Sequence, residues 1–257
     1  MRRWFCLPGQ GFPLHPVGVQ KSASVEYLYG LNPVFECLRA GRRRLHAAFI
    51  NERAGKGGRF GSLLQLITKA GLEPEPVDKG RLQQLCGSRE HQNIVLKTAR
   101  YPYAPLLECL SAERLLLLDN VEDPHNVGAI LRSAEVLGFH HVLLPAKGVP
   151  EVYPSVVKVS AGATEFLRIA RESSAIAYVR KAAEAGYTIA ALDAAGKSTL
   201  EEFPPADNLL LVIGGEDKGV RQFILNQADV VLSIPQRGRV NSLNASVAAA
   251  LAMYALR

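Results

Sequence analysis

Three short polar segments in the second half of the chain contain the residues best suited to chemistry. They span residues 123–132, 214–219 and 234–244, and each follows an apolar run. Apolar runs of this length predict buried strands, so we expect the polar segments in loops at strand ends. Ligands bind at such loops in an open α/β sheet. Their asparagine, arginine, serine and glutamate side chains are therefore the first candidates for a binding or catalytic site.

The first segment contains Asn126 and Arg132. Asp123 and Pro124 form a turn signal ahead of a helix, so Asn126 lies near a helix N-terminus, where it can contact a substrate or simply cap the helix. Arg132 comes six residues later, and a regular helix puts it on a different face from Asn126. Either the helix begins later, or one of the two side chains serves a neighbouring subunit.

The other two segments contain Glu216, Ser242 and Asn244. The Glu216 carboxylate can orient an arginine or accept a hydrogen bond from a substrate hydroxyl, or it is a first-turn acid favoured by a helix dipole. Ser242 and Asn244 begin the last predicted helix, where they can orient a substrate or act as N-cap residues. Gly214 allows a ligand to approach the backbone closely, or it ends a strand with a turn.

Several other chemistries are not predicted. The chain lacks the glycine-rich loop of ATP-hydrolysing enzymes, and the spacing of its glycines at 214–219 does not match the dinucleotide-binding fingerprint. The four cysteines, Cys6, Cys37, Cys86 and Cys109, are far apart and have no histidine at zinc spacing. We therefore expect free thiols, with neither a metal site nor a disulfide framework.

The elements that must position the three segments alternate between strands and helices. From Arg114 onward, strands are predicted at 115–118, 141–144, 188–192, 209–213 and 230–234, and helices at 127–137, 154–161, 175–185, 222–227 and 242–256. This alternation predicts a mostly parallel sheet that is covered on both faces. The fold class is therefore α/β.

The first half predicts a separate, smaller α/β domain at about residues 26–100. Its predicted elements are helices at 32–39, 62–70 and 81–86 and strands at 46–51 and 93–98. Residues 101–112 begin with two closely spaced prolines and are predicted to link this domain to a second one at 113–257. Residues 1–25 contain no acidic residue but several prolines and glycines, which favours a flexible tail over an organelle transit segment.

The charge of the chain favours a polyanionic partner. The 257 residues have a net charge of +6, and a basic protein can neutralise the phosphates of a nucleic acid. Seven basic residues gather in the first domain: Arg39, Arg42, Arg43, Arg44, Arg53, Lys56 and Arg59. We expect them to follow a phosphate backbone, and the alternative is a solvated face beside a mobile loop.

The three segments resemble the signature motifs of one enzyme family. In order along the chain they are Asn126-x-Gly128-x-x-x-Arg132, Gly214-x-Glu216-x-x-Gly219, and Ile234-Pro235 followed by Ser242-Leu243-Asn244. They are similar to those of the SpoU, or TrmH-like, RNA ribose 2′-O-methyltransferases of the SPOUT superfamily. The resemblance covers about residues 114–257 and implies a parallel-sheet domain with a C-terminal trefoil knot. Gln236 and Ala245 depart from the usual pattern.

The resemblance also implies the reaction and its site. A methyl group would pass from S-adenosylmethionine to a ribose 2′-hydroxyl of RNA, a reaction that needs no metal. The implied catalytic residues are Asn126, Arg132, Glu216, Ser242 and Asn244, and the implied cofactor-binding residues are Gly214, Gly215, Ile234 and Leu243. Because a free guanidinium stays protonated, we expect Arg132 to hold the phosphate beside the target ribose instead of acting as a base.

The first domain resembles a ribosomal-protein-like RNA-binding domain, on the segments Tyr29-Gly-Leu-Asn-Pro-Val and His91-Gln-Asn-Ile-Val. This combination favours the family branch that methylates a guanosine of large-subunit ribosomal RNA. A tRNA ribose methyltransferase and a catalytically inactive ribosomal-RNA-binding assembly factor are the alternatives. Retention of Asn126, Arg132 and Glu216 argues against the inactive factor.

The last predicted helix is apolar on nearly all sides after Ser246, and such a helix must be covered on all sides. Relatives of the family are homodimers through this region, so we expect a symmetric homodimer through the C-terminal domain, with burial inside one subunit as the alternative. The apolar runs are strand-length, and a membrane span needs about 20 residues. We expect no membrane association and a cytoplasmic location.

Overall fold

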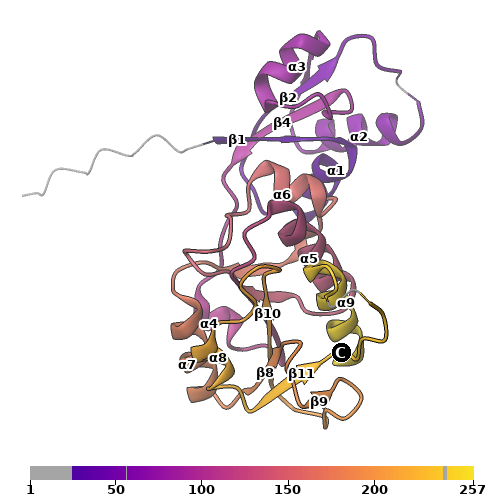
Figure 1. Cartoon of the computed structure of the whole chain (residues 1–257). Helices are drawn as coiled ribbons and strands as arrows, with labels where there is room; N and C mark the ends of the chain where they lie inside the picture. The colour runs from indigo at the N-terminus through magenta and orange to yellow at the C-terminus, as the bar shows by residue number, and fades with distance from the viewer. Residues whose placement is uncertain (1–24, 56, 240–241) are drawn as a thin grey trace, which may run out of the picture.

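The computed structural model describes residues 25–55, 57–239 and 242–257. Two units follow one another along the chain, and each is built on its own sheet (Figure 1). The expected tail lies outside the described residues, except for Val25, which begins the first strand. Among the described residues, no helix combines the length and the apolar character needed to cross a membrane.

The first unit contains a four-stranded sheet with the order β1-β4-β2-β3. Its strands are β1 (Val25–Tyr29), β2 (Leu45–Asn51), β3 (Pro74–Val77) and β4 (Ile94–Ala99). Strand β4 pairs antiparallel with both β1 and β2, and β2 pairs parallel with β3. The sequence did not predict β1 or β3. Strand β3 contains two prolines, which a sheet tolerates only at an edge, so its pattern is not that of a typical strand.

Three helices pack on this sheet: α1 (Leu31–Ala40), α2 (Gly58–Lys69) and α3 (Lys79–Cys86). All three agree with the predicted helices in position, although α2 begins four residues before the predicted start at residue 62. Helix α3 begins at a conventional cap, because the Asp78 side chain accepts a hydrogen bond from the backbone nitrogen of Arg81.

The second unit contains a seven-stranded sheet with the order β7-β6-β5-β10-β8-β11-β9, and all of its strand pairs are parallel. The strands are β5 (Arg114–Asp119), β6 (His141–Leu143), β7 (Arg168–Ala170), β8 (Thr188–Leu192), β9 (Ser198–Thr199), β10 (Leu209–Gly214) and β11 (Val230–Ser233). The predicted parallel α/β sheet is confirmed. Strands β7 and β9, with three and two residues, were not predicted.

Helices cover both faces of this sheet (Figure 1). Helices α5 (Pro124–Val136), α6 (Pro154–Val159) and α9 (Ala245–Ala255) pack on one face, and α4 (Leu106–Cys109), α7 (Ala175–Glu184) and α8 (Gln222–Leu225) pack on the other. A short 3₁₀ helix, η1 (Ala163–Phe166), follows α6. The leucines at 115–118 of β5 are fully buried, as expected for a strand covered on both sides.

The strand order reverses between β5 and β10. Strand β6 follows β5 on one side, whereas β10 lies on the other side, next to β8. A reversal of this kind opens a crevice beyond the carboxyl ends of the two strands. The first polar segment follows β5 and the second follows β10, so the sheet brings both to the same edge.

The junction between the two units is packed. The predicted linker has no regular element up to Pro105, and α4 follows. Tyr101 and Ala104 within it are buried, and a single apolar cluster extends from Leu28 and Val34 of the first unit to α5 and α6 of the second.

Candidate functional site

The carboxyl ends of four neighbouring strands form one edge of the second sheet. In the register of the central pairs, Asp119 of β5 lies beside Gly214 of β10, and Leu192 of β8 lies beside Ile213 of β10. Strand β11 ends next to them, just before Ile234. The three polar segments therefore leave the sheet at adjacent positions.

Backbone contact requires glycine at both positions 214 and 215. A Cβ atom on Gly215 would lie 2.0 Å from the carbonyl oxygen of Asn120, and one on Gly214 would lie 2.3 Å from the carbonyl carbon of Gly219. No side chain fits at such separations. The sequence suggested that a ligand approaches Gly214 closely. The structure shows that the backbone of Gly219 and Val220 lies close enough to exclude a side chain at this position even without a ligand.

An ion pair with a buried carboxylate ties the loop after β10 to β5. Asp119 is fully buried, and its Oδ2 accepts a hydrogen bond of 2.9 Å from the backbone nitrogen of Arg221. The guanidinium of Arg221 lies 3.2 Å from Asp119 Oδ1 and donates to the side-chain oxygen of Asn120 at 2.9 Å. Burial raises the pKa of Asp119 above its usual value. These contacts hold the loop after β10 against the loop after β5.

Asn126, Glu216 and Asn244 form a hydrogen-bonded network that joins the three segments. The Nδ2 of Asn244 donates to Glu216 Oε1 at 2.5 Å and to Asn126 Oδ1 at 2.9 Å. The Nδ2 of Asn126 donates to Glu216 Oε1 at 3.3 Å. Three residues predicted as catalytic are thus in contact, although 118 positions separate the first from the last. Only Oε1 of Glu216 is used, and Oε2 has no partner within the described part of the chain.

The last helix begins at Ala245, three residues later than predicted. Asn244 is its N-cap: its Oδ1 accepts from the backbone nitrogen of Ser246 at 3.0 Å. The backbone nitrogen of Ala245 donates to Glu216 Oε1 at 3.2 Å, so the carboxylate also satisfies the helix start. Capping and contact with the other segments were alternatives in the sequence, and Asn244 does both. Positions 240 and 241 lie outside the described residues.

A cavity of about 250 Å³ opens on one side of this network. All four residues predicted to bind a cofactor line it, and they are joined by Glu216 and Ser242. The four are Gly214, Gly215, Ile234 and Leu243. The sequence did not predict the contribution of residues 192–194, at the end of β8. Asp193 among them could have been found, because it directly follows a predicted strand of the same sheet.

A second cavity of about 180 Å³ lies beside the first. It is lined by residues 120–123, Asn126 and residues 215–218. Gly215 and Glu216 line both cavities, so the Glu216 carboxylate stands at the boundary between them. Two ligands bound in the two cavities would therefore meet at Glu216.

Arg132 is not part of the network. It is exposed on α5, and its guanidinium has no hydrogen bond or ion pair within the described residues. Helix α5 begins at Pro124, earlier than predicted, so a later helix start does not bring Arg132 beside Asn126. The other explanation from the sequence, that one of the two side chains serves a neighbouring subunit, stays a prediction.

The seven basic residues of the first unit do not form one surface. The prediction that Arg43 binds RNA is wrong, because its side chain is fully buried between Glu26 and Glu165. Arg42 is half-buried, and its guanidinium donates to the carbonyl oxygens of Glu165, Leu167 and Pro102. Both guanidinium groups are therefore occupied by the protein itself.

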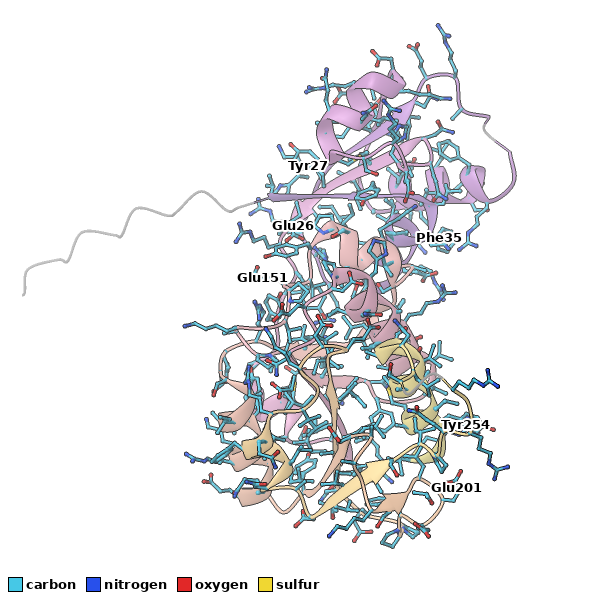
Figure 2. The ribbon with its side chains drawn as sticks, in the orientation of Figure 1. Glu26, Tyr27, Phe35, Glu151, Glu201 and Tyr254 are labelled. Carbon is cyan, nitrogen blue, oxygen red and sulfur yellow. The ribbon has the colours of Figure 1, made fainter. Side chains whose placement is uncertain are left out.

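Four of the others remain exposed: Arg39, Arg44, Arg53 and Arg59. Arg39 pairs with Glu36 at 3.0 Å, and the guanidinium of Arg59 lies over the ring of Phe35, which is labelled in Figure 2. The predicted contact of Lys56 lies outside the described residues. These four side chains lie at the surface, and their contact with a phosphate backbone stays a prediction.

The described residues contain no group of three or more histidine, cysteine, aspartate or glutamate side chains placed to hold a metal ion. Cys37, Cys86 and Cys109 are free thiols, and Cys6 lies outside the described part of the chain. Burial raises the pKa of Cys109 to about 11, so this thiol stays protonated at neutral pH.

Two family models match the chain. The model described as the SpoU rRNA Methylase family matches residues 113–254. The model described as RNA 2'-O ribose methyltransferase substrate binding matches residues 27–104. Each match falls on one of the two units.

Individual proteins resemble the chain over most of its length. A putative TrmH family tRNA/rRNA methyltransferase of Bacillus subtilis, YacO, is 32% identical over 236 residues, which cover 89% of this chain and 94% of YacO. A solved RNA 2'-O ribose methyltransferase superposes with a TM-score of 0.75 at 24% identity and covers 92% of this chain and 89% of its own. The SpoU methyltransferase AviRb of Streptomyces viridochromogenes, solved with AdoMet, has a TM-score of 0.74 at 23% identity, with coverage of 89% and 88%.

Replacing Gly215 by alanine tests the backbone contact with Asn120. We expect Gly215→Ala to lower the free energy of unfolding by about 1–3 kcal/mol, because the added methyl group forces the two loops apart. Urea denaturation measures the change. Gly57→Ala is the matched control, since a Cβ atom at that position meets nothing within 4 Å. Equal stability of the two variants would show that the loops are not in contact.

Replacing Glu216 by alanine tests the network at the start of α9. We expect backbone amide exchange at Ala245 and Ser246 to become about tenfold faster, because the loss of a hydrogen bond to a charged group costs about 1.5 kcal/mol. Asp217→Ala is the control, because the neighbouring carboxylate makes no hydrogen bond among the described residues. Exchange rates that do not differ between the two variants contradict the role assigned to Glu216.

Proposed function

The chain belongs to the SpoU rRNA methylase family, and from this premise we propose that it transfers a methyl group from S-adenosylmethionine to a ribose 2′-hydroxyl of RNA. One observation supports the proposal above all others. Two cavities share the Glu216 carboxylate as their boundary, and the network of Asn126, Glu216 and Asn244 holds that carboxylate in place. Transfer of a group between two bound molecules needs this kind of arrangement.

We assign the larger cavity to the cofactor. Gly214 and Gly215 leave backbone open toward the cavity, while Ile213, Ile234 and Leu243 provide apolar surface. The Asp193 carboxylate on the same wall can accept hydrogen bonds from hydroxyl or ammonium groups. S-adenosylmethionine, when bound, supplies a methyl group that is activated by a sulfonium.

The smaller cavity would receive the target ribose. There the free oxygen of Glu216, Oε2, can accept the hydrogen of the 2′-hydroxyl, while Oε1 stays bound to the two asparagines and the helix start. Asn126 lines this cavity and fixes the direction of the carboxylate. Ser242, on the wall of the larger cavity, orients the reacting groups from the other side.

We propose a symmetric homodimer through α5 and α9, which pack against each other. The side chains of Val247, Leu251 and Tyr254 lie on one face of α9 and are 48%, 44% and 58% exposed, and Val136 at the end of α5 is 72% exposed. Tyr254 lies on the outer side of the molecule (Figure 2). A second subunit would cover this apolar surface. Arg132, one turn before Val136, would then reach the partner's site and hold the phosphate next to the target ribose.

The proposed substrate is a guanosine of large-subunit ribosomal RNA. The separate first unit supports it, because this unit matches a substrate-binding family model and carries exposed arginines. A tRNA substrate and an inactive assembly factor remain the alternatives, and the complete network argues against the inactive factor.

We propose a ribosomal-protein-like RNA-binding domain at about 26–100, a connecting segment at 101–112, and a catalytic domain at 113–257 with a C-terminal trefoil knot. Packing of α9 against both α5 and β10, after the long segment 234–244, supports such a knot. The proposed location is the cytoplasm.

Transfer of labelled methyl from S-adenosylmethionine tests the function. The acceptors are an unmodified transcript of large-subunit ribosomal RNA and bulk unmodified tRNA, with the modified ribose mapped by its alkali-resistant linkage and Glu216→Ala as the inactive control. Label at a guanosine 2′-oxygen of the ribosomal RNA is the expected result. Label only in tRNA would contradict the proposed substrate but support the proposed reaction. If the protein binds the cofactor and neither RNA is labelled, the result would favour the inactive assembly factor.

Heterodimers of two inactive variants test whether Arg132 acts on the partner. Arg132→Ala and Glu216→Ala chains are co-expressed with different tags, and the mixed dimer is purified. One of its two sites then contains an intact Glu216 and an intact Arg132 from the other chain, so we expect about half of the wild-type activity. If Arg132 acts in its own subunit, both sites lack one residue and the mixed dimer is inactive.

A further inference from the structure

A buried ion cluster joins the two units of the chain. Arg43 lies in the loop between α1 and β2, and Glu165 lies in η1 of the second unit. The Nε of Arg43 is 2.9 Å from Glu165 Oε2, its Nη2 is 2.8 Å from Glu165 Oε1, and its Nη1 is 2.7 Å from Glu26 Oε2. The side chains of Arg43 and Glu165 are 0% and 1% exposed. Glu26, on β1, is labelled in Figure 2 next to the second unit.

Arg42 and Tyr101 make further hydrogen bonds across the same junction, beside this cluster. Arg42 donates to the carbonyl oxygens of Glu165 and Leu167 in the second unit. The hydroxyl of Tyr101 lies 3.0 Å from the carbonyl oxygen of Thr164 and 2.9 Å from that of Leu167. Burial raises the pKa of Tyr101 well above its usual value, so the hydroxyl keeps its proton and remains a donor. The segment around η1 is therefore held by three side chains of the preceding unit and junction.

A second contact lies apart from the cluster. Lys158 of α6 donates to the carbonyl oxygen of Glu90 at 3.1 Å, and its ammonium group lies 5.8 Å from the centre of the Tyr29 ring. Partial burial lowers the pKa of Lys158. One contact would leave the first unit free to turn about it, whereas two separate contacts define an orientation.

The chemistry of the cluster favours a single arrangement. Apolar surfaces can slide over one another at small cost, because their attraction is not directional. A bidentate guanidinium–carboxylate pair accepts one geometry, and a buried charge that loses its partner is strongly disfavoured. A buried ion pair adds little net stability compared with an apolar pair of the same shape, so its contribution here is to orientation.

In each of the two units, the cluster lies next to residues with a proposed function. On one side, Arg44 follows Arg43 in the chain and is exposed, and Arg39 precedes it on the end of α1. On the other side, η1 packs against α5, the helix that carries Asn126 near its start. The cluster thus connects the exposed arginines to the proposed site of methyl transfer through short, packed segments.

We infer that Arg43 and Glu165 are positioning residues that hold the first unit at one orientation, so that an RNA bound to its exposed arginines presents the target ribose to Glu216. This inference rests on the proposed function for its RNA readout. An RNA long enough to touch both units depends on the cluster, whereas a short RNA that reaches only the second unit does not.

The experiment compares wild-type protein with Arg43→Met/Glu165→Leu, which replaces the pair by apolar side chains, and with Glu165→Gln, which keeps the shape. Glu108→Gln is the matched control, because it breaks the 2.9 Å pair with Arg168 inside the second unit. The acceptors are the full large-subunit ribosomal RNA transcript and a short hairpin cut from it around the methylated ribose. S-adenosylmethionine affinity is measured by calorimetry.

On the full transcript we expect kcat of both cluster variants to fall about tenfold while KM for RNA changes less than about threefold, because RNA still binds but its ribose is misaligned. On the hairpin, the variants and the Glu108→Gln control should match wild type, and cofactor affinity should stay within about twofold. An equal loss on both RNAs, or wild-type rates on both, overturns the inference. If the apolar double variant does not fold, Glu165→Gln alone decides between these outcomes.

Small-angle X-ray scattering separates this inference from the proposed function. If wild-type protein methylates no RNA, the proposed function is wrong. The scattering profiles then still test whether Arg43 and Glu165 hold the two units at one orientation. We expect wild-type and Glu108→Gln profiles to fit one fixed arrangement of the two units, and the cluster variants to require a range of arrangements. Identical profiles for all proteins overturn the positioning role.

Discussion

The backbone contact between Gly215 and Asn120 is the constraint on which the site depends. A carbonyl oxygen and an α-carbon meet where β5 and β10 end, at a distance that excludes any side chain. Because the loops after these strands are in contact, the Asp119 carboxylate can reach Arg221, and Glu216 can reach Asn126. The same closeness leaves one cavity on each side of Glu216. A larger separation of the two strands would remove all of these contacts at once.

The network of Asn126, Glu216 and Asn244 combines structure and chemistry in one carboxylate. Its Oε1 accepts from two side-chain amides and from the first backbone nitrogen of α9, which fixes its direction. A carboxylate held in this way needs no reorganisation when a hydroxyl approaches its other oxygen. In the proposed reaction the methyl group is already activated, so alignment and proton removal are what remain for the protein.

Three consecutive arginines, Arg42, Arg43 and Arg44, lie in three different environments. Arg43 is enclosed by Glu26 and Glu165, Arg42 binds carbonyl oxygens at the junction, and Arg44 faces solvent. A planar guanidinium with several fixed donors suits all of these environments. The three consecutive arginines therefore contribute both to the junction between the units and to the surface of the first unit.

The sequence by itself determined the parallel α/β sheet and most helices, because periodic apolar runs are local signals. Its motifs also predicted that Asn126, Glu216 and Asn244 belong to one site, and the structure brings these three side chains into contact. It missed β1, β3, β7 and β9, of which β3 contains two prolines and β7 and β9 have only three and two residues, and it placed the start of α9 three residues too early. Tertiary structure alone decided that Arg43 is buried and that Asp193 lines the cavity beside Gly214. Each of these depends on a partner distant in sequence: the fate of Arg43 is set by Glu165, 122 residues away, and no local pattern contains that contact.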